Sequence, residues 1–554
     1  GDTDGEAEAG GDTDGEAEAT DTDGGAEAGA HTGGGGGFLP PLIIGLEDIP
    51  SEQAQRPMTW DYTRTGHLGI AGAPRTGRTS FLRALATGIA TTASPADAHI
   101  YGIDAGSGGL LPLISLPHTG AIITRDQSDR LRRLLTKLTT QITTRQQTLA
   151  AAGHTSLAEQ RAAADPDDRL PYLILLIDRW DGLTTVYETV DGGKILEQIR
   201  ILLREGAAMG LRAAITGDRT TFRSHMGMLL EDRLIFRMPT PDSFDLVGMR
   251  ARDVPATMPP GRAFRTGPSH PREVQTPLLD TTPTGTAQTT AFYHHARTAT
   301  TRWPTPPPHR QPPHIDDLPL TITAPEALAL GPTPPPDHLP LGIGGDTLHI
   351  HTTTMEDAGN GILITGPRRS GRSTALTFIL HTTLAHHTPT ILITPPPPPR
   401  RPPLTDSAPH PAITATLDTT NTADDLTTLL NNNHNTLLII DDLDTLGKTH
   451  ELAEAAHDYM LACRDHPGGV IITCNIDDIL GTYRGLLTDV RKNRTGLILA
   501  PRSSADGDIF HTPFPALSAP PSHPDAPSSP PPPAGPGSKS PTHHHPNKTN
   551  EHNT

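Results

Sequence analysis

Two octapeptides with the same spacing constrain the fold of this chain more than any other feature. Residues 72–79 and 366–373 both follow the pattern Gly-x4-Gly-basic-hydroxyl, and each lies between an apolar run typical of a buried strand and apolar residues at helical spacing. The glycines let the backbone curl so that its N–H groups point at phosphate oxygens, and the following helix N-terminus adds partial positive charge. One such loop could be an incidental turn, but two in the same context predict two phosphate-binding loops.

The predicted nucleotide-binding residues are the sixteen members of these loops. The first loop consists of Gly72, Ala73, Pro74, Arg75, Thr76, Gly77, Arg78 and Thr79. The second consists of Gly366, Pro367, Arg368, Arg369, Ser370, Gly371, Arg372 and Ser373. The final hydroxyl of each loop is the predicted Mg²⁺ ligand. Arg78 and Arg372 stand where such loops usually carry lysine, and a planar guanidinium has the wrong shape for efficient transfer at the γ-phosphate.

A phosphate loop needs a carboxylate at the end of a neighbouring strand to hold Mg²⁺, and usually a second one to orient water. Asp178 follows the apolar run 172–177, and Asp441 with Asp442 follows the run 437–440. We therefore predict catalytic roles for Asp178, Asp441 and Asp442, and Mg²⁺ coordination by Thr79, Asp178, Ser373 and Asp441. Arg179 occupies the second position after the first run, so no water-orienting acid is evident there.

Several other polar residues allow a functional and a structural interpretation. Arg204, Arg233 and Arg237 could reach the phosphates of a neighbouring subunit, although a solvated arginine at the end of an element is the commoner case. Thr216 and Thr473 close later apolar runs and could sense the γ-phosphate or simply end a strand. His118, His386 and His387 lack ligand partners at the spacing of a zinc site.

Apolar runs that alternate with helical patterns predict an α/β fold with mainly parallel central sheets. We expect an acidic, low-complexity linker over residues 1–37, a first domain over 38–281 and a second over 341–517. The stretch 282–340 is crowded with Pro and Thr and is predicted to be a linker, with room for one strand added to a neighbouring sheet. The Pro-, Ser- and His-rich tail 518–554, including the run 543–545, is predicted to be disordered.

Composition narrows the functional classes. The formal net charge is -18, and residues 1–37 carry no Lys or Arg, which argues against a generally basic nucleic-acid binder. Two cysteines, Cys463 and Cys474, are too few for a disulfide framework and indicate a reducing, cytoplasmic setting. No apolar run of about twenty residues is present. The chain begins with Gly1, so a membrane anchor on a missing N-terminal part or on a partner stays open.

Beyond the two loops, an ordered series of short motifs resembles the tandem ATPases of the FtsK/SpoIIIE family, including the actinobacterial EccC-type ATPase of type VII secretion. The resemblance covers about residues 40–275 and 341–515. It rests on residues 45–50 with Gln53 and Gln55, on 101–104, 116–120, 175–178, 204–206, 217–219 and 260–262, and on 366–373 and 494–499.

The resemblance implies two RecA-like P-loop NTPase domains, ATP bound with Mg²⁺ between subunits, a homo-oligomeric ring, and movement of double-stranded DNA or of a secreted protein. It also implies that some modules have lost catalytic residues. Arg78, Arg179 and Arg372 depart from the competent pattern. Three functions follow: a regulatory pair of ATP-binding modules, which we favour, an active DNA translocase, or a pseudo-ATPase scaffold that docks a partner or a secretion substrate.

Overall fold

The computed structural model describes residues 39–255, 257–266, 271–394, 410–431, 435–447, 450–479, 484–512 and 514. The predicted linker 1–37 and tail 518–554 lie outside this set. The chain divides into two compact units: unit 1 comprises Gly1–Thr321 and Gly344–His349, and unit 2 comprises Ile322–Ile343 and Ile350–Thr554. Each unit is described by itself.

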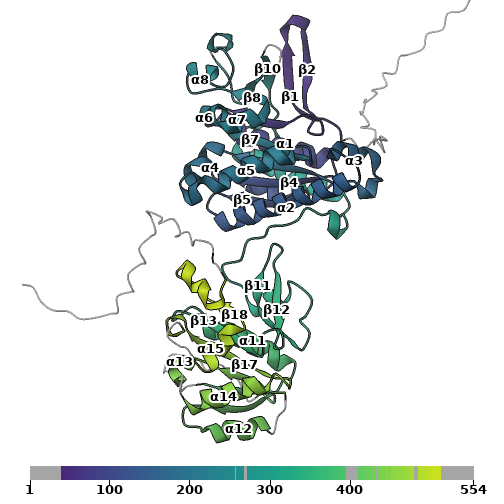
Figure 1. The fold of residues 1–554 in the computed structure, drawn as a ribbon. Coiled ribbons are helices and arrows are strands. Elements are labelled where there is room, and N and C mark those ends of the chain that lie inside the picture. Colours follow the sequence, from purple (N-terminus) through teal and green to yellow (C-terminus); the bar gives the residue numbers. More distant parts are fainter. Residues whose placement is uncertain are drawn as a thin grey trace, which may run out of the picture. The chain divides into compact units, whose positions relative to one another are not determined.

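Unit 1 is built on one ten-stranded sheet in the order β2-β1-β10-β9-β8-β3-β7-β6-β4-β5. The strands from β8 to β5 in this order are parallel, and β9, β10, β1 and β2 extend the sheet with antiparallel pairs (Figure 1). The strands are β1 (Leu42–Ile49), β2 (Ala54–Trp60), β3 (His67–Ala71), β4 (Ala98–Asp104), β5 (Thr119–Thr124), β6 (Tyr172–Asp178), β7 (Leu211–Gly217), β8 (Leu230–Phe236), β9 (Arg262–Thr266) and β10 (Arg272–Gln275).

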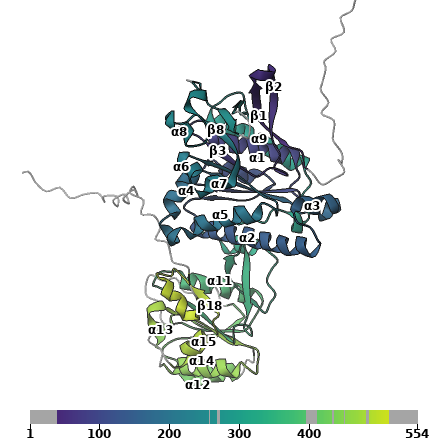
Figure 2. The ribbon, with the colours of Figure 1, turned by 45° about the horizontal axis from the view of Figure 1, so that its top comes forward.

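Helices cover both faces of this sheet because its central strands are apolar on both sides. One face packs against α1 (Arg78–Thr92) and α9 (Gly285–Arg302). The other packs against α2 (Ser128–Ala151), α4 (Trp180–Tyr187) and α5 (Lys194–Gly206), with α2 and α5 side by side (Figure 2). Shorter helices are α3 (Leu157–Ala163), α6 (Arg219–Arg223), α7 (His225–Leu229) and α8 (Asp242–Asp245).

Unit 2 contains a six-stranded, wholly parallel sheet in the order β15-β14-β16-β17-β13-β18. Its strands are β13 (Gly361–Gly366), β14 (Thr390–Ile393), β15 (Ile413–Leu417), β16 (Leu437–Ile440), β17 (Gly469–Asn475) and β18 (Gly496–Ile498). Helix α11 (Arg372–Ala385) covers one face, and α12 (Ala423–Asn431), α14 (Glu451–Ala462) and α15 (Leu486–Lys492) cover the other. The unit also has α10 (Ala324–Leu328) and α13 (Leu443–Leu446), and β11 (His338–Gly344) pairs with β12 (His349–Thr354).

The predicted fold class is confirmed, and the two sheets share one topology. In unit 1, β3 lies between β7 and β8, and in unit 2, β13 lies between β17 and β18. The chain leaves β3 through α1 and enters β4, which lies beyond β7 and β6. It leaves β13 through α11 and enters β14, which lies beyond β17 and β16. Each predicted phosphate loop therefore lies where the strand order reverses. Ligands of open α/β sheets bind at the carboxyl ends of strands at such a point.

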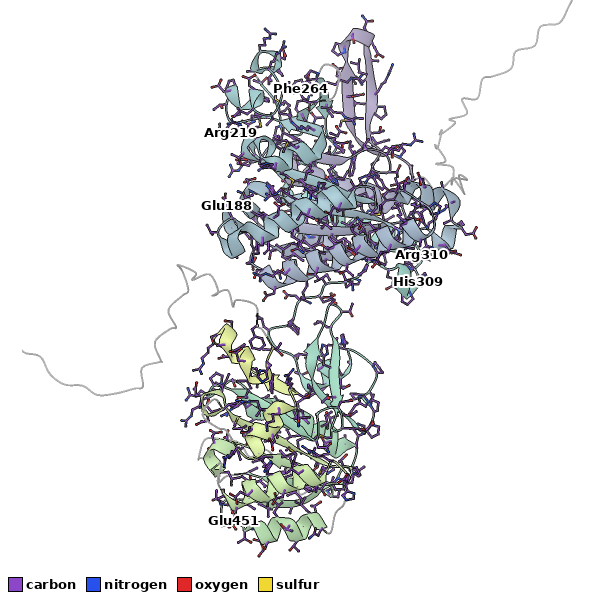
Figure 3. The ribbon with its side chains drawn as sticks, viewed as in Figure 1. Glu188, Arg219, Phe264, His309, Arg310 and Glu451 are labelled. Carbon is purple, nitrogen blue, oxygen red and sulfur yellow. The ribbon has the colours of Figure 1, made fainter. Side chains whose placement is uncertain are left out.

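The stretch 282–340, which the sequence predicts to be a linker, is partly integrated into unit 1. Helix α9 places Phe292, Ala296 and Ala299 in the core beside α1. Further on, Arg310 donates to the carbonyl oxygens of Ala96 and Arg169 at 3.4 Å, and Figure 3 shows Arg310 against this unit. No helix of the described residues is long and apolar enough to cross a bilayer.

Candidate phosphate-binding sites

The first loop is bound to the ends of two neighbouring strands. The N–H of Gly72 donates to the carbonyl oxygen of Gly217 at the end of β7 at 3.3 Å, and the N–H of Ala73 donates to that of Arg237, just after β8, at 2.8 Å. The Thr76 hydroxyl donates back to the Ala73 carbonyl oxygen at 2.8 Å and closes the turn. The loop therefore has a fixed position at the carboxyl edge of the sheet.

Both loops adopt the left-handed backbone conformation at the same two places. The φ angles are 63° at Arg75 and 108° at Gly77 in the first loop, and 65° at Arg369 and 95° at Gly371 in the second. The glycine in each pair immediately precedes the helix, α1 or α11. A side chain there would be strained, so the second glycine of the motif is needed for the loop to curl before the helix begins.

In unit 1, the predicted Mg²⁺ ligands lie together. The hydroxyl of Thr79, at the second position of α1, donates to Asp178 Oδ2 at 2.8 Å. The hydroxyl of Thr216, on β7, donates to Asp178 Oδ1 at 2.6 Å and accepts the N–H of Arg179 at 2.8 Å. Two hydroxyls thus orient one buried carboxylate at the end of β6, and one of them belongs to Thr216, near the end of β7.

Unit 2 has the same contacts between a threonine and the strand aspartate. The hydroxyl of Thr473, on β17, donates to Asp441 Oδ1 at 2.8 Å and accepts the N–H of Asp442 at 2.7 Å. Asp441 is 3% exposed, and Asp178 is 2% exposed. The residue that follows each acid is left-handed, with φ of 53° at Asp442 and 63° at Arg179. The strand, acid and threonine are therefore equivalent in the two units, while the residue after the acid has opposite charge.

The two loop arginines point at different partners. In unit 1, Arg78 Nη1 donates to the Gly217 carbonyl oxygen at 2.8 Å, while Asp181 is paired with Arg179 at 3.2 Å. In unit 2, Arg372 Nη2 lies 3.1 Å from Asp442 Oδ1, and its Nη1 lies 3.6 Å from Asp444 Oδ1. The guanidinium of Arg372 and both carboxylates are mostly buried. Arg372 is thus paired with two carboxylates that follow β16, whereas Arg78 donates to a backbone carbonyl oxygen.

Burial changes the electrostatics of the first site. Desolvation raises the pKa of Asp178, while the hydrogen bonds from Thr216 and Thr79 and the nearby charge of Arg78 oppose the rise. Desolvation also lowers the pKa of Arg78, against the charges of Asp181 and Asp178. A negative charge at Asp178 is therefore costly without a cation close by, which suits a residue that would share a divalent metal.

Two acids near the candidate sites are not among the residues predicted from the sequence. Asp104, at the end of β4, is fully buried and accepts the N–H groups of Gly106 at 2.8 Å and Leu110 at 2.7 Å. Asp444 accepts the N–H of Asn475 at 3.2 Å besides facing Arg372. An acid after an apolar strand could have pointed to Asp104, but nothing in the local sequence distinguishes Asp444 from a surface aspartate.

Several of the other candidate residues make contacts within their own unit. Arg233 donates to the carbonyl oxygens of Leu230 and Gly227, and its guanidinium lies over the Phe222 ring. The Arg204 side chain is 64% exposed beside Glu205, and Arg237 contributes its backbone carbonyl to the first loop. His118 is buried against the Ala93 carbonyl oxygen, and His387 stacks on His410. None of the three arginines lies in either loop.

The profile of the FtsK/SpoIIIE family matches residues 44–229, which span β3, the first loop, α1 and Asp178. Residues 44–229 of this chain are thus similar to the FtsK/SpoIIIE family. The chain is 28% identical over 356 residues to the ESX secretion system protein EccC of Thermomonospora curvata, a match that covers 63% of this chain and 26% of EccC. The chain thus corresponds to about a quarter of that relative.

Two solved structures share the fold of both units. ATPases 2 and 3 of EssC from Geobacillus thermodenitrificans superpose with a TM-score of 0.66 at 17% identity, covering 86% of this chain and 92% of that one. ATPases 2 and 3 of Thermomonospora curvata EccC, in complex with a signal sequence peptide, give a TM-score of 0.53 at 22% identity, covering 85% and 88%. The chain therefore has the tandem RecA-like architecture that the sequence predicted.

Proposed function

We propose that this chain supplies two ATP-binding modules to a type VII secretion motor, and that these modules regulate the motor rather than drive it. One observation carries the proposal: each acid that would hold the metal is positioned by a threonine on the next strand, while the residue that would orient water is altered. That residue is Arg179 in unit 1, and it is Asp442, paired with Arg372, in unit 2.

The oxygen ligands of unit 1 fit a hard divalent cation. Mg²⁺ prefers a few protein oxygens together with water and phosphate oxygens. The Thr79 hydroxyl and the Asp178 carboxylate meet at 2.8 Å beside the start of α1. We propose that these two residues hold Mg²⁺ in unit 1 and that Ser373 and Asp441 do so in unit 2. Mg²⁺ would neutralise phosphate charge there, and the loop N–H groups would bind the phosphates.

Because Arg179 replaces the water-orienting acid in unit 1 and Asp442 is paired with Arg372 in unit 2, bound ATP would remain intact for long periods. Such a module transmits its nucleotide state through its conformation, which is a regulatory role. In a homo-oligomeric ring of the longer protein, these modules would report occupancy to a competent ATPase domain. The expected cargo is a secreted protein, because the relatives with matching sequence are secretion proteins.

Calorimetric titration of MgATP into the full chain tests this proposal. We expect two binding sites, of which Asp178→Ala removes one and Asp441→Ala the other. Steady-state turnover should stay below about 0.01 per second, far under the usual range for enzymes of 1–10³ per second. Asp465→Ala, at an exposed position of unit 2, is the control variant and should keep both sites. Absence of heat with the unaltered chain would end the proposal.

A second function, substrate docking, is favoured for unit 2 by the Arg372 pairing. A loop arginine that is already paired with Asp442 and Asp444 offers less charge to a phosphate. The EccC structure with a signal sequence peptide shows that a related ATPase pair can bind such a segment. Peptide binding that is insensitive to ATP and to Arg372→Ala would support docking. The DNA-translocase alternative stays a prediction, and DNA-stimulated turnover that Asp178→Ala abolishes would favour it.

A further inference from the structure

A glycine-rich loop after β4, residues 105–109, lies directly against the predicted metal ligands of unit 1. A Cβ on Gly109 would come within 2.5 Å of Thr79 Cγ2 and 3.9 Å of Asp178 Oδ2. A Cβ on Gly106 would come within 3.1 Å of Asp104 Oδ1 and 3.4 Å of Asp178 Oδ2. The backbone of this loop can approach the hydroxyl and the carboxylate so closely only because these positions lack side chains.

Asp104 and Arg83 hold this loop from its two ends. Asp104 accepts the N–H groups of Gly106 and Leu110, which fixes the beginning of the loop and the residue after it. Arg83, on α1, donates from Nε to the Gly109 carbonyl oxygen at 2.6 Å. The charge of Arg83 faces the carboxylates of Asp104 and Asp178. The loop, the acids and the first turns of α1 are thus one connected structure.

The same guanidinium extends the connection to helix α9. Arg83 Nη1 donates to the Thr289 hydroxyl, on α9, at 3.2 Å. Helix α9 belongs to the Pro- and Thr-rich stretch through which the chain leaves unit 1. One side chain therefore contacts both the loop at the metal ligands and the last long helix of the unit.

We propose that Arg83 is a positioning residue for metal–nucleotide binding in unit 1, because it holds the loop 105–109 against Thr79 and Asp178 and ties that loop to α9. This inference rests on the nucleotide-binding role proposed above. Arg83 and α9 are the part of unit 1 that regulates nucleotide binding. When α9 shifts, the bond to Thr289 changes, and the carbonyl oxygen of Gly109 loses or gains its donor. Nucleotide affinity in unit 1 then depends on the position of α9.

The test uses mant-ATP and the full chain. All three tryptophans, Trp60, Trp180 and Trp303, lie in unit 1, so energy transfer from tryptophan to the mant group reports binding there. We expect Arg83→Ala to weaken binding about tenfold with Mg²⁺ and less than about twofold in EDTA, since the loop acts on the metal ligands. Arg83→Lys should recover part of the loss, and Thr289→Val should lose about threefold.

Three outcomes distinguish the proposal from its alternatives. Equal affinity of Arg83→Ala and the unaltered chain with Mg²⁺ would overturn it, as would an equal loss with Mg²⁺ and in EDTA, which indicates only a structural role. Arg200→Ala, at a half-buried arginine of α5 that pairs with Glu197, is the matched control and should change neither value. If the unaltered chain binds no nucleotide, the proposed function fails instead.

Hydrogen exchange then still tests the positioning role. Arg83→Ala should speed exchange at the amides of Gly106 and Leu110, both of which donate to Asp104. Unchanged exchange at these amides would overturn the inference whether or not nucleotide binds.

Discussion

Units 1 and 2 place equivalent residues on equivalent strands, yet they pair their charges differently. In unit 1, Arg179 pairs with Asp181, and the loop arginine Arg78 donates only to a backbone carbonyl oxygen. In unit 2, an aspartate replaces that arginine, and Arg372 pairs with Asp442 and Asp444 instead. The residue after the strand aspartate is positive in unit 1 and negative in unit 2. This difference determines whether the loop arginine is paired with that residue. We expect the two units to differ in nucleotide affinity for this reason.

The largest expected difference between the units is their response to acid. The buried histidines among the described residues, His67, His99 and His118, all lie in unit 1. Desolvation lowers the pKa of His67 and His118 to about 4 and that of His99 to about 3. Below about pH 6.5 the three imidazoles take up protons in the unfolded chain but not in the folded unit. The free energy of unfolding therefore falls as the pH drops from there towards 4.

Each histidine that is protonated only in the unfolded chain lowers the free energy of unfolding by about 1.4 kcal/mol per pH unit, which gives roughly 4 kcal/mol per pH unit for the three. Tryptophan fluorescence monitors unit 1, and exposure of the two thiols, Cys463 and Cys474, monitors unit 2, where both are buried. The fluorescence transition should come at the higher pH. If the thiols become reactive first, the comparison is wrong.

The second prediction breaks the charge pairing of unit 2. Asp442→Asn with Asp444→Asn removes both negative charges that face Arg372 and keeps the left-handed backbone at residue 442, which asparagine tolerates. Nucleotide affinity of unit 2 should rise about tenfold, because phosphate no longer competes with two carboxylates. Calorimetry with ATP in an Asp178→Ala background isolates this site. Asp465→Asn serves as the control, and an unchanged or weaker affinity in the double variant would count against the pairing.

The third prediction gives unit 1 the charge of unit 2. Arg179→Asp removes the partner of Asp181 and places a second carboxylate near Arg78, whose charge already interacts with Asp181. Nucleotide affinity of unit 1 should fall about fivefold, since Arg78 then gains acidic competitors. Arg179→Asn removes the positive charge without adding a negative one and should have a smaller effect. Equal effects of the two variants would show that charge reversal is not the cause.

The smallest expected effect concerns Asp178, the proposed metal ligand of unit 1, and the destabilisation that its buried charge causes. Burial raises the pKa of Asp178, so its charged form destabilises the folded unit at neutral pH, and this penalty disappears as pH falls below the usual carboxyl range. Asp178→Asn should therefore raise the unfolding midpoint of unit 1 at pH 7.5, by a few degrees at most, since 1 kcal/mol shifts a domain of this size by about 2–4 °C. Thermal scans at pH 7.5 and pH 4 should show a smaller gain at the lower pH.

Much of the fold could be predicted from local patterns. The loops with left-handed glycines, the apolar strands and the acids that follow them all leave short-range signals in the sequence. Helix α9 was missed because its apolar residues Phe292, Ala296 and Ala299 are few and lie among threonines in a proline-rich stretch. Packing against α1 stabilises this helix, whose own sequence has only a weak amphipathic pattern.

The charge pairs could not be predicted, because they join residues far apart in the chain. Arg372 and Asp444 are 72 positions apart, and only the parallel order of β13, β17 and β16 brings their elements together. The contact of Thr79 with Asp178 was predicted because both belong to a known pattern. The contact of Arg83 with Gly109 belongs to no such pattern and became visible only in the structure.

The most direct test of the central claim is the chemical state of the bound nucleotide. The full chain is mixed with a substoichiometric amount of γ-labelled ATP and Mg²⁺, freed of unbound label, and quenched at intervals up to one hour. Two modules that bind without hydrolysing should retain nearly all of the label as ATP throughout. Rapid release of labelled phosphate, abolished by Asp178→Ala or by Asp441→Ala, would contradict the account and identify the unit that is an active ATPase.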